Sequence, residues 1–285
     1  THRRSSAASD VYKRQKDMII DSHQHFWNYE PEKHSWIDEE MSVIRRDFLS
    51  DDLQKVFTEN GVDACVAVQA DQTTEETDFL ISIAENNNFI KGVVGWVDLR
   101  SESIEDDLLK YKKYNVVKGF RHVVQGEQDH NFMLRPEFLR GINLLGKYDL
   151  CYDILIFPHQ LGATLELVKK FPNQKFVIDH IAKPYIKDGF FEGWAVMMRE
   201  IAKHQNVYCK ISGMITEADY KTWTPEQVHP YMKLVFESFG ASRVMYGSDW
   251  PVCLVAGNYS IVKALVTDFI TCLLYTSPSP RDNTT

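Results

Sequence analysis

Residues 18–25 read MIIDSHQH, a short apolar run followed by two histidines that are separated by one residue. The run Met18–Asp21 has the length of a strand rather than of a helix. Seven further short apolar runs follow it along the chain, at 62–69, 90–97, 116–120, 151–156, 175–179, 207–211 and 243–247. Near-continuous runs rich in Val and Ile are typical of parallel strands that are buried on both faces.

Amphipathic stretches separate these runs and predict helices. The stretch 49–60 ends at Gly61, a helix stop signal, and 74–87 places apolar residues on one stripe. Similar stretches lie at 102–114, 136–148, 162–171, 193–205 and 224–239, and the segment after Tyr259 is helical in pattern. Eight strands alternating with helices predict a (β/α)₈ TIM barrel. An open doubly wound sheet is the alternative, disfavoured because no glycine-rich phosphate loop follows any run.

The two ends of the chain share an unusual relation. Asp10–Gln15 and Cys272–Ser277 back-translate into DNA words that are reverse complements over nearly their whole length. Such words resemble transposase-type sequencing adapters, which have no place in fold reasoning. We therefore interpret 1–15 and 272–285 as adapter-derived scars, 16–271 as one barrel domain, and its last helix as truncated.

Composition limits the class of partner and the compartment. The formal net charge of −8 disfavours nucleic acid and anionic membranes as partners. Four cysteines inside the domain form no C-x-x-C pair, which indicates reduced thiols in a cytoplasmic protein. No apolar run reaches the roughly 18 residues of a membrane span, and no signal peptide precedes Met18. The oligomeric state stays open.

Polar residues follow the apolar runs, where a barrel places its active site. Those at the ends of the runs are His23, His25, Gln69, Arg121, His122, His159, Asp179, His180 and Asp249; the run 207–211 itself carries Lys210, and Trp250 comes directly after Asp249. Alternate residues of a strand face the same side, so His23 and His25 point together and suit a divalent ion such as Zn²⁺. Two structural hydrogen bonds are the alternative for this pair, and a turn or helix cap is the alternative for Asp249.

Five sequence words taken together resemble the sugar-lactonase branch of the amidohydrolase superfamily. They are IDSHQHFW, GFRHVVQ, VIDHIAKP, CKISGM and YGSDWPVC, and they cover residues 18–258 in order. The resemblance implies a (β/α)₈ barrel hydrolase that opens a small-molecule sugar lactone to the free aldonic acid.

The resemblance also implies roles for individual residues. The implied metal ligands are His23, His25 and Asp249, with His180 as a further candidate. The implied catalytic residues are Asp249, His180, Arg121 and His122, and the implied substrate-binding residues are Trp27, Gln69, His159, Lys210 and Trp250. Arg121-His122 stands where a two-metal site needs a lysine, so we expect one divalent metal, preferably zinc, or a metal-independent site.

The expected reaction begins when Asp249 takes a proton from water, which attacks the lactone carbonyl. We expect Asp179 to orient His180, and His34 to be exposed in the long loop 28–46. Two other readings stay open. One is a metal-dependent decarboxylase of a small aromatic acid on the same barrel, and the other is a truncated, non-catalytic fragment.

Overall fold

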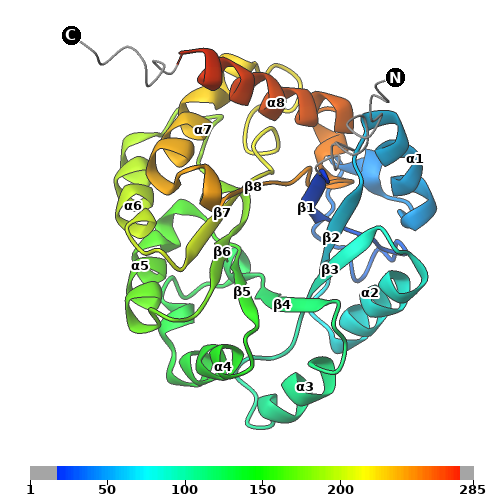
Figure 1. Ribbon diagram of the computed structural model, residues 1–285, viewed down its shortest axis with the longest axis vertical. Coiled ribbons are helices and arrows are strands. Elements are labelled where there is room, and N and C mark those ends of the chain that lie inside the picture. The colour runs from blue at the N-terminus through cyan, green and yellow to red at the C-terminus, as the bar shows by residue number, and fades with distance from the viewer. Residues whose placement is uncertain (1–17, 277–285) are drawn as a thin grey trace, which may run out of the picture.

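The structure is a computed structural model that describes residues 18–276. Eight parallel strands form one sheet in the order β1 to β8 and curve into a nearly closed barrel (Figure 1). The strands are β1 (Ile20–Gln24), β2 (Ala64–Val68), β3 (Ile90–Gly95), β4 (Val117–His122), β5 (Cys151–Ile154), β6 (Phe176–Ile178), β7 (Val207–Ile211) and β8 (Val244–Tyr246). The predicted (β/α)₈ fold is confirmed.

Helices form an outer ring around the barrel (Figure 1). They are α1 (Ser50–Asn60), α2 (Thr74–Asn86), α3 (Ile104–Tyr111), α4 (Pro136–Lys147), α5 (Leu161–Lys170), α6 (Glu192–Ala202), α7 (Pro225–Phe239) and α8 (Tyr259–Thr276). Their ends follow local chemistry. Helix α7 begins with Pro225, whose missing N–H costs nothing there, and α1 ends at Gly61 in the left-handed conformation with φ 63°.

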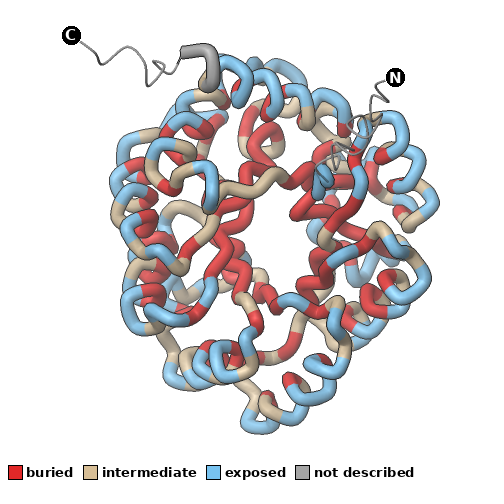
Figure 2. Tube along the Cα trace, in the orientation of Figure 1, coloured by how far each residue is buried: buried red, intermediate tan, exposed pale blue. Residues whose placement is uncertain are grey.

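Burial follows the two layers of the barrel. Buried residues line the strands and the inward faces of the helices, whereas the outward faces are exposed (Figure 2). Close approach of the strands requires a glycine in β4, because a Cβ at Gly119 would lie 2.4 Å from the Cys151 carbonyl oxygen. The sheet is thus packed tightly enough to hold side chains at its rim in defined positions.

The barrel closes where the first and last strands meet. The amide of Asp249 donates to the carbonyl of His23, and the amide of His25 donates to the carbonyl of Trp250, both at 2.8 Å. Below them, the Asp21 carboxylate accepts the amides of His23 at 3.1 Å and of Ser248 at 2.9 Å. This seam brings together residues that are more than 220 positions apart in the chain.

Two boundaries differ from the sequence predictions. The first strand runs from Ile20 to Gln24, whereas the sequence predicted it from Met18 to Asp21. Helix α8 continues past 271 to Thr276. The scar predicted at 1–15 and residues 277–285 of the scar predicted at 272–285 lie outside the described residues, and the domain limits and the truncated last helix stay predictions.

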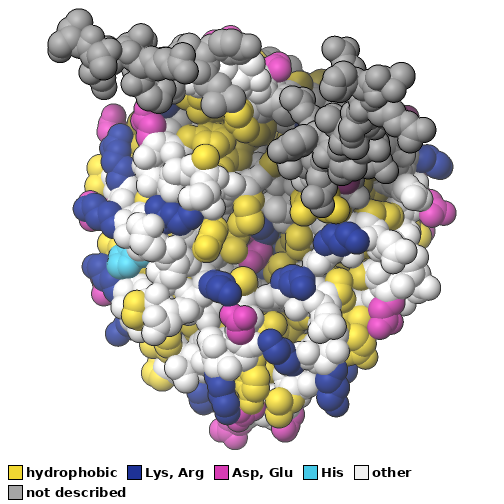
Figure 3. All heavy atoms as spheres, in the orientation of Figure 1, with side chains coloured by type: hydrophobic (Ala, Val, Ile, Leu, Met, Phe, Trp, Pro, Cys, Tyr) yellow, Lys and Arg dark blue, Asp and Glu magenta, His cyan; other side chains and the backbone are white. Residues whose placement is uncertain are grey.

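The charge of the surface and the hydropathy of the helices bear on whether the protein could contact a charged partner or cross a membrane. On the face drawn in Figure 3, basic side chains lie among acidic, apolar and uncharged ones. No helix within residues 18–276 is both long enough and apolar enough to cross a membrane.

Candidate active site

Three imidazoles and one carboxylate meet at the carboxyl end of the barrel. His23 lies on β1, His25 directly follows it, His180 follows β6 and Asp249 follows β8. Asp249 Oδ1 lies 3.3 Å from His25 Nε2, 3.8 Å from His23 Nε2 and 3.9 Å from His180 Nε2. The structure therefore brings together the four residues from which the sequence predicted a metal site.

The partner of His25 defines which ring nitrogen faces the cluster. Its Nδ1 lies 2.8 Å from the carbonyl oxygen of Val68, which can only accept, so Nδ1 holds the proton. In the neutral ring, Nε2 then presents a lone pair to the Asp249 carboxylate and lies 3.2 Å from His23 Nε2. Electron-rich atoms facing each other at such distances form a cradle for a cation.

The chemistry of these donors suits a divalent metal. One ligand atom from each of His23, His25 and Asp249 lies within 4.8 Å of the other two, and all three residues are buried. Two imidazoles and one carboxylate with room for a further ligand form a set that binds Zn²⁺. A second group, His23, Asp179 and His180, is less suitable because Asp179 is already paired with two cationic side chains.

Asp249 is held as a carboxylate by its surroundings. Burial alone would raise its pKa, but the imidazoles of His180, His25 and His23 outweigh this and lower the pKa well below the usual value. Its backbone has a φ of 57°, a conformation that non-glycine residues rarely adopt. The hydrogen bond from the Asp249 amide to the His23 carbonyl stabilises this conformation and directs the side chain toward the histidines.

His180 is held by the loop that follows β7. Its Nδ1 lies 2.9 Å from the Ser212 hydroxyl, and a Cβ at Gly213 would lie 2.4 Å from the same nitrogen. Gly213 has a φ of 60°, so both its conformation and its lack of a side chain are required here. Burial, only partly opposed by Asp249 and Asp179, lowers the pKa of His180 to about 4, which keeps the ring neutral near pH 7.

Buried charges lie beneath the histidines. Asp179 pairs with Arg121 at 3.0 Å, with Lys210 at 3.0 Å and with His23 Nδ1 at 3.3 Å. The expectation that Asp179 orients His180 is therefore wrong, because its carboxylate points inward to β1, β4 and β7. Lys210 also pairs with Asp153 at 2.5 Å. Asp153 was missed by sequence reasoning, although a lone Asp inside the apolar run CYDILI was a usable signal.

A cavity of about 430 Å³ opens directly over the cluster. His25, Arg121, His180 and Asp249 line it among the predicted site residues. Its other polar or aromatic lining residues are Lys33, Trp36, Asp71, Gln72, Gln125, Lys183, Thr216, Glu217 and Tyr220. These come from loops, where no periodic pattern marks a position as facing the site, so sequence reasoning missed them.

Several predicted site residues do not line this cavity. Trp27 and Trp250 are buried against Phe48, and Trp27 donates to the Arg46 carbonyl at 2.8 Å. His34, expected to be exposed, is instead buried beside Trp27.

Three more predicted residues lie outside the cavity lining. The His122 ring pairs with Glu127 at 2.7 Å and stacks on Phe132. His159 is exposed, beside the Tyr185 hydroxyl. Gln69 is buried: its side-chain amide donates to the backbone carbonyl of Arg121 at 3.2 Å, and its backbone carbonyl accepts from the Arg121 guanidinium.

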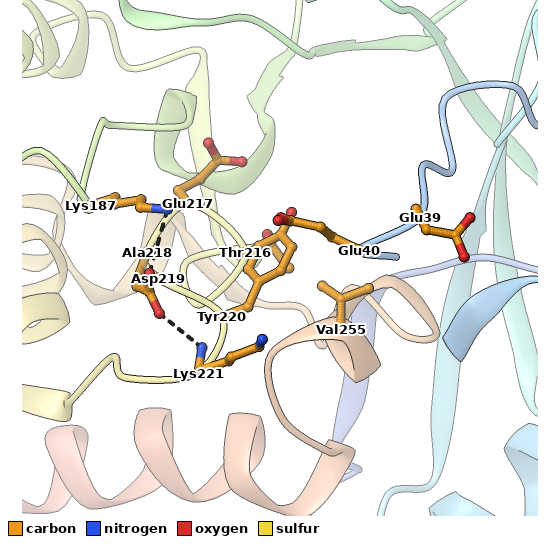
Figure 4. A pocket seen from close by; sticks show the side chains of 10 residues that line it. All are labelled: Glu39, Glu40, Lys187, Thr216, Glu217, Ala218, Asp219, Tyr220, Lys221 and Val255. Carbon is orange, nitrogen blue, oxygen red and sulfur yellow. Dashed lines mark hydrogen bonds and ion pairs between the residues drawn. The ribbon is translucent and has the colours of Figure 1, made fainter. Parts of the chain in front are cut away.

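A second cavity adjoins the first. It has a volume of about 590 Å³ and shares Thr216, Glu217 and Tyr220 with the catalytic cavity. Figure 4 shows its lining, in which Lys187 and Lys221 both contact Asp219. Thr216, Glu217 and Tyr220, which belong to the segment between β7 and α7, therefore form a wall between two recesses.

Comparison with known proteins assigns this eightfold barrel to a family. The sequence model of the family described as Amidohydrolase matches residues 20–271, nearly the whole barrel. The chain belongs to the amidohydrolase family.

Individual relatives refine this assignment within the amidohydrolase family. An L-fucono-1,5-lactonase of Burkholderia ambifaria is 38% identical over 242 residues, covering 84% of this chain and 82% of the relative. An L-fucono-1,5-lactonase of Burkholderia multivorans is 35% identical and covers 87% of both chains. A crystal structure of an amidohydrolase from Burkholderia multivorans with bound zinc is 35% identical, with a TM-score of 0.87 over 90% of this chain and 92% of that one.

Proposed function

We propose that this amidohydrolase opens a sugar lactone to the free aldonic acid. The observation that supports this most directly is the buried cluster of Asp249 with His23, His25 and His180 at the floor of a polar cavity. Two relatives that cover more than four fifths of the chain are L-fucono-1,5-lactonases, which makes an aldonolactone the expected substrate class.

We further propose that the site works with one divalent metal, preferably zinc. His23, His25 and Asp249 would hold it, with His180 as a further ligand within reach. When bound, such an ion acts as a Lewis acid toward a carbonyl or lowers the pKa of water. The zinc in a solved relative that is 35% identical supports this choice.

The residues of the chain then have separable roles. Asp249 is deprotonated at neutral pH and accepts the proton of the attacking water. The water oxygen forms a bond to the lactone carbonyl carbon, and the carbonyl π electrons move to the carbonyl oxygen, which becomes an oxyanion. Arg121, which lines the cavity, donates to this oxyanion.

Ring opening completes the reaction. The oxyanion reforms the carbonyl, and the ring C–O bond breaks with its electrons on the ring oxygen. Protonated Asp249 returns its proton to this alkoxide, and His180 can transfer the proton because its ring is neutral and borders the cavity. Lys210 acts indirectly on the substrate, because its ammonium contacts and positions Asp179 and His23. We propose no step for His122 and His159, which lie outside the cavity lining.

Substrate binding relies on loop residues of the cavity. The indole of Trp36 is 41% exposed and lines the cavity, so it can pack on the apolar face of a sugar ring in the place first expected for Trp27 and Trp250. Gln125 Oε1 is buried without a hydrogen-bond partner among the described residues and can accept from a substrate hydroxyl.

Decarboxylation of a small aromatic acid has less support from the site. Such a substrate carries a carboxylate, yet every lysine and arginine that lines the described cavity is already paired with an acidic side chain. The pairs are Lys33–Glu30, Arg121–Asp179 and Lys183–Glu217.

A pH-indicator assay of aldonolactones on chelated and zinc-loaded protein tests the proposal. The variant Asp249→Asn keeps the shape of the side chain but cannot accept a proton, so we expect kcat/KM to fall by about 10²–10⁴-fold. The matched control Asp219→Asn alters a carboxylate outside the catalytic cavity and should retain turnover. Unchanged lactone hydrolysis by Asp249→Asn would refute the assigned role.

A further inference from the structure

The loops that follow β6 and β7 meet at an ion pair on the wall of the catalytic cavity. Lys183 Nζ lies 2.6 Å from Glu217 Oε1, and the two side chains are only 18% and 13% exposed. Both residues line the cavity that contains Asp249 and His180. The backbone supports the same contact, since the Lys187 amide donates to the Glu217 carbonyl at 3.0 Å.

Glu217 neutralises the positive charge of Lys183, which would otherwise face the substrate. Of the lysines and arginines that line the described cavity, Arg121 is neutralised by Asp179 beneath it and Lys33 pairs with Glu30 at the exposed rim. Lys183 remains as the partly buried ammonium beside the catalytic cluster, and Glu217 holds it. A substrate carboxylate at Lys183 would either displace Glu217 or share the ammonium with it, and in both cases it would lie close to the negative charge of Glu217.

We propose that Glu217 determines which substrate charge the site accepts: by pairing with Lys183, it restricts the site to uncharged polyhydroxylated lactones and excludes lactones that carry a free carboxylate. This inference rests on the proposed lactonase function and goes further, because it identifies a residue that selects among lactones. Glu217 acts here through Lys183 and not on the reacting carbonyl.

The test compares two lactones of the same sugar, an aldonolactone and the aldarolactone that carries a terminal carboxylate. Wild-type zinc-loaded protein should prefer the aldonolactone in kcat/KM. In Glu217→Gln, which keeps the side-chain shape and removes the charge, Lys183 becomes free to bind the carboxylate. The kcat/KM ratio of aldarolactone to aldonolactone should then rise about tenfold or more.

Two further variants separate this explanation from general disturbance of the loop. The double variant Glu217→Gln with Lys183→Gln should lose the gain, because the freed ammonium is gone. Asp219→Asn removes a carboxylate two residues away, whose partner Lys187 lies in the adjoining cavity (Figure 4), and should leave the ratio as in the wild type. A ratio that does not change in Glu217→Gln, or that rises equally in the double variant, overturns the proposal.

Calorimetric binding of the same two lactones distinguishes this failure from failure of the proposed function. If neither lactone is hydrolysed but the relative affinity for the aldarolactone rises in Glu217→Gln and returns in the double variant, the lactonase proposal fails and the role of Glu217 stands. If the aldonolactone is hydrolysed while neither turnover nor binding responds to Glu217→Gln, the role of Glu217 fails alone.

Discussion

At the scale of single residues, burial and neighbouring charges shift the pKa values of the site residues in opposite directions. Burial disfavours every charged form, so it lowers the pKa of the His180 and His23 imidazoles and would raise that of Asp249. The surrounding histidines outweigh burial at Asp249 and lower the pKa of its carboxyl. The result is a carboxylate at Asp249 beside the neutral rings of His23 and His180, which is the protonation state that a general base and a metal ligand set both require.

His180 should make folding stability depend on pH. Its pKa is about 4 in the folded protein and about 6.5 in an unfolded chain, so between these values the unfolded state binds more protons. As the pH falls from 6.5 to 4, the free energy of unfolding of the metal-free protein should fall relative to that of His180→Asn. The expected slope is about 1.4 kcal/mol per pH unit.

Urea unfolding of both proteins at several pH values within this window measures the difference. Comparison with the variant is needed because burial raises the pKa of Asp21 and of Asp153 to about 6, and their effect on stability has the opposite sign. Stability curves of wild type and variant that run parallel across the window would show that His180 does not titrate in this way.

At the scale of elements, the seam between β1 and β8 determines the geometry of the site. The Asp21 carboxylate accepts the amides of His23 and Ser248 and, at 3.0 Å, the hydroxyl of Tyr259 at the start of α8. One buried side chain thus holds the first strand, the last strand and the last helix together. Asp21 does not touch the His23 ring, so it positions the backbone from which His23 and Asp249 project.

Replacing Asp21 with Ala should therefore affect stability and activity together. The change leaves buried donors without acceptors, and each costs about 1–3 kcal/mol. We expect a clear drop in the urea midpoint and a loss of lactone turnover, because His23 and Asp249 lose their common anchor. The control Tyr259→Phe removes only one donor to the same carboxylate and should be milder; equal stability losses in both variants would contradict this account.

At the scale of the whole molecule, a ligand that binds only the closed barrel should stabilise the entire fold. The proposed metal site joins β1 to the segment after β8, so it exists only when the sheet is closed. Free zinc at about 100 times its Kd should add about 2.7 kcal/mol to the free energy of unfolding and raise Tm.

Thermal unfolding with and without zinc measures this effect. His25→Ala should abolish most of the rise, whereas His159→Ala, which alters an exposed histidine outside the cluster, should keep it. A rise in Tm that is the same in all three proteins would point to zinc bound elsewhere and would contradict the assigned ligands.

Much of this molecule could be predicted from its sequence. Alternation of buried apolar runs with amphipathic stretches depends on local periodicity, so the eight strands and the barrel were predictable. The positions of His23, His25, His180 and Asp249 were also predictable, because the carboxyl ends of parallel strands must meet at one rim.

Only the tertiary structure decided which long-range contacts those residues make. It paired Asp179 with His23 rather than His180, buried Trp27 and Trp250, and placed Trp36 and the Lys183–Glu217 pair on the cavity wall. The physical reason is that loop residues have no repeating pattern, so their burial and partners depend on how loops distant in the chain pack over the barrel. Likewise, Asp153 and Lys210 form their buried ion pair only when the sheet closes into a barrel.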